Sequence, residues 1–112
     1  MATMEEIQAF ADRVADEFHP ERIILFGSYA QGTQTPDSDV DMLVIMPFEG
    51  KPWRMASDIR KRVRPPFPLD IIARTPSQIH ERFGLGDCFM REINEQGRIL
   101  YEKRIVRGGA DC

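Results

Sequence analysis

The stretch LFGSYAQGTQTPDSDVDMLVIM, from Leu25 to Met46, decides the fold because it joins two apolar segments through a polar loop. The first segment, Arg22–Phe26, reads RIILF, and the second, Val40–Met46, reads VDMLVIM. Short apolar and β-branched runs between turn residues predict buried strands. Gly27 ends the first strand, and the polar residues 28–38 predict one helical turn followed by a looser turn.

Negative charge is concentrated at the start of the second strand, where Asp37 is followed by Asp39 and Asp41. Because side chains alternate along a strand, Asp39 and Asp41 are expected to project to the same side, with Cα atoms roughly 6.5–7 Å apart. Two like charges about 4 Å apart repel by roughly 4 kcal/mol at an effective dielectric constant near 20. A divalent cation reverses the sign of this interaction, and carboxylates together with substrate phosphates are the ligands that Mg²⁺ prefers.

A third aspartate, Asp70, lies inside the apolar segment Leu69–Ala73, which predicts another strand. A charge in such a segment is costly unless it is paired or bound to a metal. If this strand lies beside the strand of Asp41, Asp70 can join the same cluster. Three carboxylates can hold two metal ions for an in-line displacement at phosphorus.

Gly27 and Ser28 provide the complementary half of a phosphate site. Glycine at the end of a strand allows a sharp turn and a close approach of the backbone to a ligand. Ser28 opens the predicted helical turn, so its backbone N–H and hydroxyl are expected to point at an anion. Phosphate donors on one side and metal-binding acids on the other predict a site for a nucleoside triphosphate.

The rest of the chain predicts an α+β fold with a small mixed sheet of about four strands flanked by helices. Apolar spacing and capping patterns predict helices at Met4–Phe18, Trp53–Val63, from Thr75 onward and at Asp87–Gln96, with a fourth strand at Arg98–Glu102. The connection between the first two strands is too short for a parallel crossover with a full helix. An antiparallel or mixed sheet is therefore favoured.

Composition sets the remaining bounds. The chain has 112 residues, 42% of them hydrophobic, which suits a single core, and we expect one domain at 1–104 followed by a disordered tail at 105–112. The net charge of −3 gives no general attraction to nucleic acid or to an anionic membrane. The chain lacks an apolar run of roughly 20 residues and a signal-peptide layout, and it has two cysteines, so a cytoplasmic protein is expected.

Gly27-Ser28, ten intervening residues and then Asp39-Val40-Asp41 resemble the signature of the DNA polymerase β-like nucleotidyltransferase superfamily. The chain looks like the minimal nucleotidyltransferase (MNT) branch, and the ending GRILYE at 97–102 is also similar. The resemblance implies that Asp39 and Asp41 bind Mg²⁺, that Asp70 is a metal ligand or base, and that Gly27 and Ser28 hold the triphosphate of ATP. One departure is visible, since many members carry Arg where this chain has Tyr29.

Lone MNT proteins are commonly antitoxins paired with a helical HEPN protein, often an RNase. The resemblance therefore implies AMP transfer to a tyrosine of a HEPN toxin within a hetero-oligomer, with no direct contact to membrane or nucleic acid. Two alternatives are open: an antitoxin with weak chemistry that neutralises its partner by binding, and nucleotide transfer to a small molecule.

Three other sequence features have simpler explanations. DSDVD at 37–41 lacks the glycine and glutamate that an EF-hand requires at its sixth and twelfth positions, and Gly27-Ser28 lacks the lysine of a P-loop. The basic cluster at 51–64 fits the solvated face of a helix. Its alternative interpretation is contact with triphosphate, RNA or an acidic partner.

Overall fold

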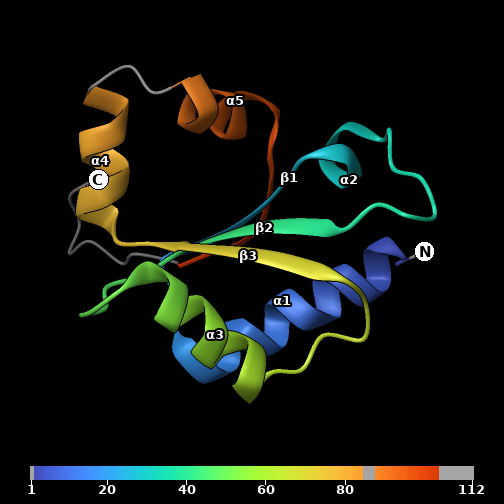
Figure 1. Ribbon diagram of the computed structural model, residues 1–112, viewed down its shortest axis with the longest axis horizontal. Coiled ribbons are helices and arrows are strands. Elements are labelled where there is room, and N and C mark those ends of the chain that lie inside the picture. Colours follow the sequence, from blue (N-terminus) through green and yellow to red (C-terminus); the bar gives the residue numbers. More distant parts are fainter. Residues whose placement is uncertain (1, 85–87, 104–112) are drawn as a thin grey trace, which may run out of the picture.

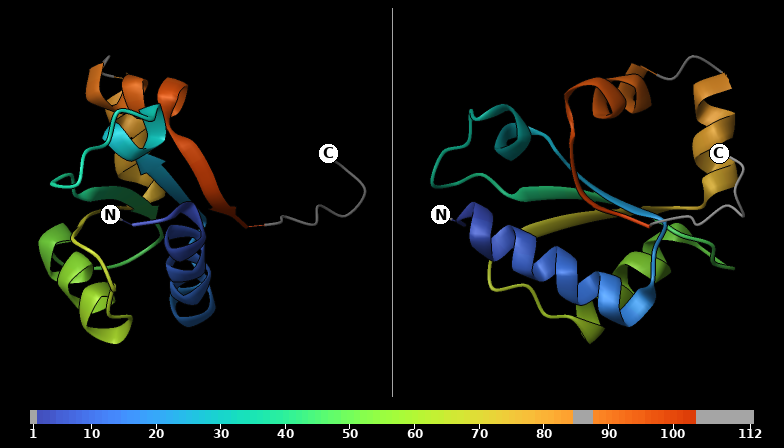
Figure 2. Two further views of the ribbon diagram at one scale, coloured as in Figure 1. Left: turned by 90° about the vertical axis from the view of Figure 1, so that its right-hand side faces the viewer. Right: turned by 180° about the vertical axis from the view of Figure 1, so that it is seen from behind.

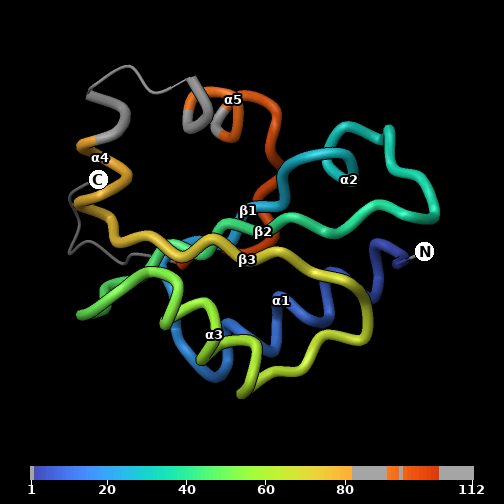
Figure 3. Tube along the Cα trace, in the orientation of Figure 1, coloured from blue at the N-terminus to red at the C-terminus, as the bar shows by residue number. Residues whose placement is uncertain are grey.

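The computed structural model describes residues 2–84 and 88–103, so the predicted tail at 105–112 lies outside the described residues. The elements in chain order are α1 (Met4–Phe18), β1 (Arg22–Phe26), α2 (Ser28–Gln31), β2 (Val40–Ile45), α3 (Pro52–Arg62), β3 (Leu69–Arg74), α4 (Pro76–Gly84), α5 (Cys88–Gln96) and β4 (Arg98–Glu102). Figure 1 shows their arrangement, and Figure 3 lets the reader follow the chain from β1 through α2 and the long loop into β2.

The strands form one mixed sheet in the order β3-β2-β1-β4. β1 pairs antiparallel with both β2 and β4, whereas β2 pairs parallel with β3. A parallel pair needs a long crossover, which α3 supplies, and the short link between β1 and β2 permits only the antiparallel arrangement. The predicted α+β fold with a mixed four-stranded sheet is confirmed.

Helices cover both faces of the sheet. α1 and α3 lie on one face, and α4 and α5 lie on the other (Figures 1 and 2). β1 and β2 are therefore buried on both sides, which explains their nearly continuous apolar sequences.

The two faces bury separate clusters of side chains. The larger core joins Val40, Met42 and Val44 of β2 to α1 and α3, through residues such as Ile7 and Ile59. The smaller core joins alternate strand residues to α5. Its buried members are Ile24, Leu43, Ile45 and Ile93. Since side chains alternate along a strand, the residue two positions before Leu43 projects to the same side as Leu43 and Ile45, toward α4 and α5.

The predicted caps are present. Thr3 and Glu6 form a reciprocal capping box at the start of α1, with hydrogen bonds of 2.9 and 3.1 Å. Thr75 and Gln78 form the same arrangement before α4. Most predicted boundaries agree within one residue. In the part of the chain that the structure describes, no helix combines the length and apolarity needed to cross a membrane.

Candidate active site

The parallel register of β2 and β3 pairs Asp41 with Asp70. Register partners on neighbouring strands project to the same face, and strands lie about 4.8 Å apart. Asp41 shares its side of β2 with Leu43, so both carboxylates are on the face covered by α4 and α5. The structure thus brings Asp70 beside Asp41, as the sequence predicts for a shared cluster.

Asp39 precedes β2 and completes an acidic group around Asp41. Burial raises the pKa of the Asp41 carboxyl above its ordinary value, and the negative charges of Asp70 and then Asp39 raise that pKa further. Asp39 and Asp70 are exposed, whereas Asp41 is half-buried. The charges of Asp70 and Asp39 therefore oppose ionisation of Asp41, which is the electrostatic situation that a bound cation relieves.

The fit of this group to a metal ion follows from its chemistry. Among the residues that the structure describes, no three acidic, histidine or cysteine side chains already lie close enough to enclose one ion. Asp39 and Asp70 are exposed, so their side chains are free to change rotamer toward Asp41. Asp41 and Asp70 share one face of the sheet and Asp39 lies just before β2, and each carboxylate is a hard oxygen donor of the kind that suits Mg²⁺.

Gly27 brings the other half of the site against Asp41. Its backbone angles, φ 74° and ψ −154°, belong to a region that only glycine adopts readily. A methyl group at this position would also overlap the Asp41 carboxylate. Two independent constraints therefore require glycine here, and the Gly-Ser turn and the acidic group are in direct contact.

Ser28 begins α2, a single helical turn that ends at Gly32 in the left-handed conformation with φ 76°. The Gly27 carbonyl accepts hydrogen bonds from the N–H groups of Ala30 and Gln31, at 3.1 and 3.2 Å. The first N–H groups of such a turn have no carbonyl within the helix, so they are available to an external acceptor. The predicted turn is confirmed.

Tyr29, the departure from the common family pattern, belongs to the larger core. It is 4% exposed, and its hydroxyl oxygen accepts a hydrogen bond from the Ala2 N–H at 3.2 Å. The side chain therefore faces α1 rather than the acidic group. The exposed residue of this helical turn is Gln31.

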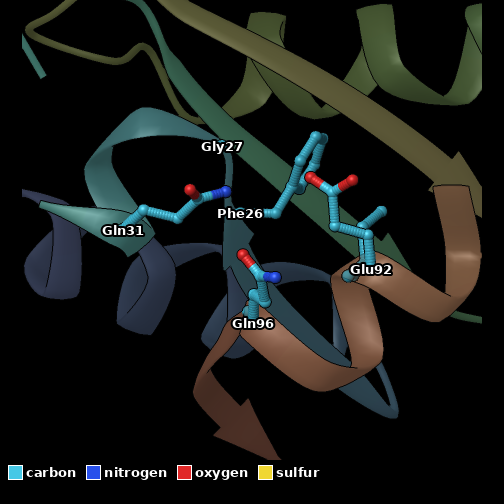
Figure 4. Close-up of a pocket in the computed structure, with 7 residues that line it drawn as sticks. Phe26, Gly27, Gln31, Glu92 and Gln96 are labelled. Carbon is cyan, nitrogen blue, oxygen red and sulfur yellow. The ribbon is translucent and has the colours of Figure 1, made fainter. Parts of the chain in front are cut away.

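A cleft adjoins Gly27 on the side of α5 (Figure 4). Its lining includes Phe26, Gly27, Gln31, Glu92, Ile93 and Gln96. Gln31, Glu92 and Gln96 belong to none of the motifs that the sequence shows. The available signal was weak: Glu92 and Gln96 are one helical turn apart and so share a face of α5, but only the tertiary fold brings that face to Gly27.

The basic cluster at 51–64 lies on or next to α3, across the sheet from the aspartates. Several of its members have structural partners. Arg60 donates to the Leu69 carbonyl, Arg62 forms an ion pair with Glu17 at 3.1 Å, and the Arg54 guanidinium lies 5.7 Å from the Trp53 ring centre. These contacts argue against a triphosphate role for the cluster.

A mixed sheet that places paired aspartates against a Gly-Ser turn is typical of enzymes that transfer nucleotides. Residues 7–101 match the family model described as "Nucleotidyltransferase domain", and the chain belongs to this family. It is a nucleotidyltransferase, as the motif at Gly27 and Asp39–Asp41 predicted. A curated relative from Methanocaldococcus jannaschii, named "Putative protein adenylyltransferase", is 31% identical over 81 residues, which cover 72% of this chain and 78% of the relative.

Solved structures share the fold. A crystal structure of a "putative nucleotidyltransferase" from Sulfolobus solfataricus has a TM-score of 0.60 at 20% identity and covers 88% of this chain and 79% of its own. A crystal structure described as a "toxin-antitoxin with AMP-PNP" has a TM-score of 0.57 at 20% identity, covering 87% and 74%. At such identities the likeness shows the fold alone.

Proposed function

We propose that this nucleotidyltransferase transfers AMP from ATP to a hydroxyl group of a partner protein and thereby acts as an antitoxin. The observation that carries the proposal is the placement of Asp41, which lies in register with Asp70 and in contact with Gly27. A triphosphate held at Gly27 would therefore meet the acidic group directly.

In this proposal Gly27 and Ser28 bind the triphosphate through backbone N–H groups and the serine hydroxyl. Asp39, Asp41 and Asp70 would hold Mg²⁺. When bound, the metal neutralises phosphate charge and stabilises the attacking and leaving oxygens. Asp70 is exposed at the edge of the group, so its carboxylate can accept the proton of an incoming hydroxyl.

The acceptor oxygen forms a bond to the α-phosphorus, and the bond from that phosphorus to the bridging oxygen of the leaving group breaks. Pyrophosphate departs, and the acceptor's proton passes to Asp70. Gly27 and Ser28 orient the phosphates throughout, so that the attacking and leaving oxygens are in line.

A protein acceptor is favoured because the relative from M. jannaschii carries the name of a protein adenylyltransferase. Structural neighbours described as toxin–antitoxin complexes support an antitoxin role. We propose a tyrosine of a HEPN-type toxin as the acceptor, in a cytoplasmic hetero-oligomer of the two proteins.

The test is incubation of the purified protein with α-phosphate-labelled ATP, Mg²⁺ and the product of the neighbouring gene. We expect label on that partner with the native chain and none with Asp39→Asn/Asp41→Asn. Asp37→Asn is the matched control, because it removes a nearby exposed carboxylate outside the proposed group. Neutralisation of the toxin by the double variant without labelling would instead support an antitoxin that acts by binding. Label on small molecules alone would support nucleotide transfer to a small molecule.

A further inference from the structure

A second pocket, of about 150 Å³, opens at the end of the sheet where β2 and β3 begin. Its walls come mainly from the start of α1, the loop before β2 and the segment that leads into β3, which lie together at this end of the molecule (Figures 1 and 2). The volume is about that of a cavity that holds one benzene molecule. The pocket therefore suits one side chain of a larger molecule.

This pocket lies next to the acidic group. Ser38, which lines it, directly precedes Asp39, and Pro68, which also lines it, is two positions before Asp70. Two positions along a strand span about 6.5–7 Å. The pocket is on the α1 side of the sheet and the acidic group is on the other side, but both are at the end where β2 and β3 begin. A protein that presents a hydroxyl to Asp70 can therefore place a neighbouring side chain in the pocket.

Backbone donors around the pocket already have acceptors within the protein. The Ala2 N–H donates to the Tyr29 hydroxyl oxygen at 3.2 Å, and the Glu6 N–H donates to Thr3 Oγ1 at 3.1 Å. The Ser38 N–H donates to a carbonyl oxygen of its own loop at 3.0 Å. These three lining residues therefore offer no backbone donor to an anion.

The lining is rich in hydrogen-bond acceptors. Pro36, Pro66 and Pro68 belong to it, and proline has a carbonyl oxygen but no N–H group. The Glu6 carboxylate adds a negative charge, and since its Oε1 accepts from the Thr3 N–H, its Oε2 is left for another donor. Among the lining residues that the structure describes, none is a lysine, arginine or histidine. The pocket therefore favours a positively charged group with several donors.

The walls are held in place without a ligand. Tyr29 and Phe67, which both line the pocket, are buried in the larger core, and the Phe67 ring packs edge-on against Phe10 with ring centres 5.8 Å apart. The Ser38 hydroxyl accepts a hydrogen bond from the Thr35 N–H at 2.9 Å, which closes the loop before β2. A pocket that is already formed loses less conformational entropy on binding.

We propose that this pocket binds an arginine or lysine side chain of the partner protein, and that the charge of this side chain pairs with Glu6 while a hydroxyl of the same protein reaches Asp70. The inference rests on the proposed function, because it takes a protein as the acceptor of AMP. It adds a specificity-determining site to the Gly-Ser and aspartate motif, on the opposite side of the sheet.

The test measures the Kd between this protein and the product of the neighbouring gene by calorimetric titration without ATP. Glu6→Gln should raise this Kd about three- to tenfold, as for loss of a hydrogen bond. Glutamine also fits a capping box, so the variant keeps the start of α1 and removes only the charge. Glu5→Gln is the matched control, because Glu5 is an exposed carboxylate in the same helical turn that does not line the pocket.

Salt and variants of the partner protein show whether the contact is ionic. The difference in Kd between the native protein and Glu6→Gln should shrink as NaCl is added, because salt screens exposed charges. When the lysines and arginines of the partner protein are replaced by glutamine one at a time, one replacement should have little further effect in combination with Glu6→Gln. In labelling assays, Glu6→Gln should raise the KM for the partner protein and leave the KM for ATP unchanged.

Equal Kd values for the native protein and Glu6→Gln, or equal weakening by Glu5→Gln, would overturn this inference and leave AMP transfer intact. Absence of binding between the native protein and the neighbouring gene product would overturn it as well. If binding depends on Glu6 but no AMP is transferred, the proposed function fails while the cationic contact stands.

Discussion

Gly27 and Asp41 are in contact across the β1–β2 pair, and the space beside the Gly27 Cα is filled by the Asp41 carboxylate. The antiparallel register pairs Asp41 with Phe26, the residue before Gly27. The absence of a side chain at Gly27 therefore allows the Gly-Ser turn to pack directly against Asp41. A substitution at either residue should change the energetic effect of a substitution at the other.

Replacement of Gly27 by alanine should destabilise the protein, because the backbone conformation disfavours a side chain by about 1–3 kcal/mol and the new methyl overlaps Asp41. In urea denaturation, Asp41→Ala should relieve the overlap, so that the two substitutions are coupled by roughly 0.5–3 kcal/mol. Gly32→Ala is the control, since Gly32 also has positive φ but has no atom within 4 Å of the added methyl. Coupling of Gly32→Ala to Asp41→Ala as large as that of Gly27→Ala would contradict the contact.

Asp41→Asn should stabilise the metal-free protein near neutral pH by no more than about 1 kcal/mol, because Asp41 is only half-buried and solvent screens the neighbouring charges. Burial and the charges of Asp70 and Asp39 raise the folded-state pKa of Asp41, so ionisation of this group disfavours folding. As the pH falls through that raised pKa, native Asp41 takes up a proton and the advantage of asparagine should fade. Thermal unfolding between pH 4 and 8 measures this difference.

The same thermal unfolding experiment can be repeated in the presence of Mg²⁺. The ion should raise the Tm of the native protein, because a ligand that binds only the folded state stabilises it, and should have little effect on Asp41→Asn. Asp37→Asn should follow the native profile in both arms. An Asp41→Asn variant less stable than the native protein at pH 7 without metal would show that the carboxylate has a stabilising partner.

Asp70→Asn should lower kcat for AMP transfer about 10²–10⁴-fold, as for loss of a general base. Binding of the nucleotide should weaken far less, because Gly27 and Ser28 remain in place. Asp58→Asn, which removes an exposed carboxylate from α3 on the opposite face, should leave both quantities unchanged. A loss of ATP binding as large as the loss of kcat would leave Asp70 with metal binding alone and would contradict its role in proton transfer.

The sequence predicts most of this site because its signals are local. Alternation predicts that Asp39 and Asp41 project to the same side, and the length of the connection between β2 and β3 is compatible with a parallel pair that brings Asp70 beside Asp41. The grouping of Gln31 with Glu92 and Gln96 depends instead on how closely α5 packs on β1, which is set by Gly97 and the smaller core. No short-range sequence pattern predicts how closely α5 packs on β1.

The burial of Tyr29 also could not be predicted from local sequence signals. The sequence showed only that Tyr29 stands where many family members carry Arg. The packing of α1 on the sheet shows that it is a core residue. Tyr29→Phe should therefore cost about 0.5–1.5 kcal/mol through loss of the hydrogen bond to Ala2 and should leave the Kd for ATP unchanged.

Tyr29→Arg, which restores the residue common in the family, should destabilise the protein by several kcal/mol because it buries an unpaired charge. Gln31→Arg should stay within about 0.5 kcal/mol of the native stability, since Gln31 is exposed. Chemical denaturation of the three variants measures these differences. A stable Tyr29→Arg protein with tighter ATP binding would return position 29 to the phosphate site.

Gly97→Ala should displace α5 from β1, because the added methyl meets the Ile93 carbonyl oxygen and Ile24 Cγ2, and neither can move without shifting the smaller core. We expect a loss of stability of about 1–3 kcal/mol, as for overpacking. Urea denaturation measures this loss. Glu95→Ala, two positions earlier and exposed, should leave the stability unchanged. A Gly97→Ala protein as stable as the native one would contradict the close packing of α5 on β1.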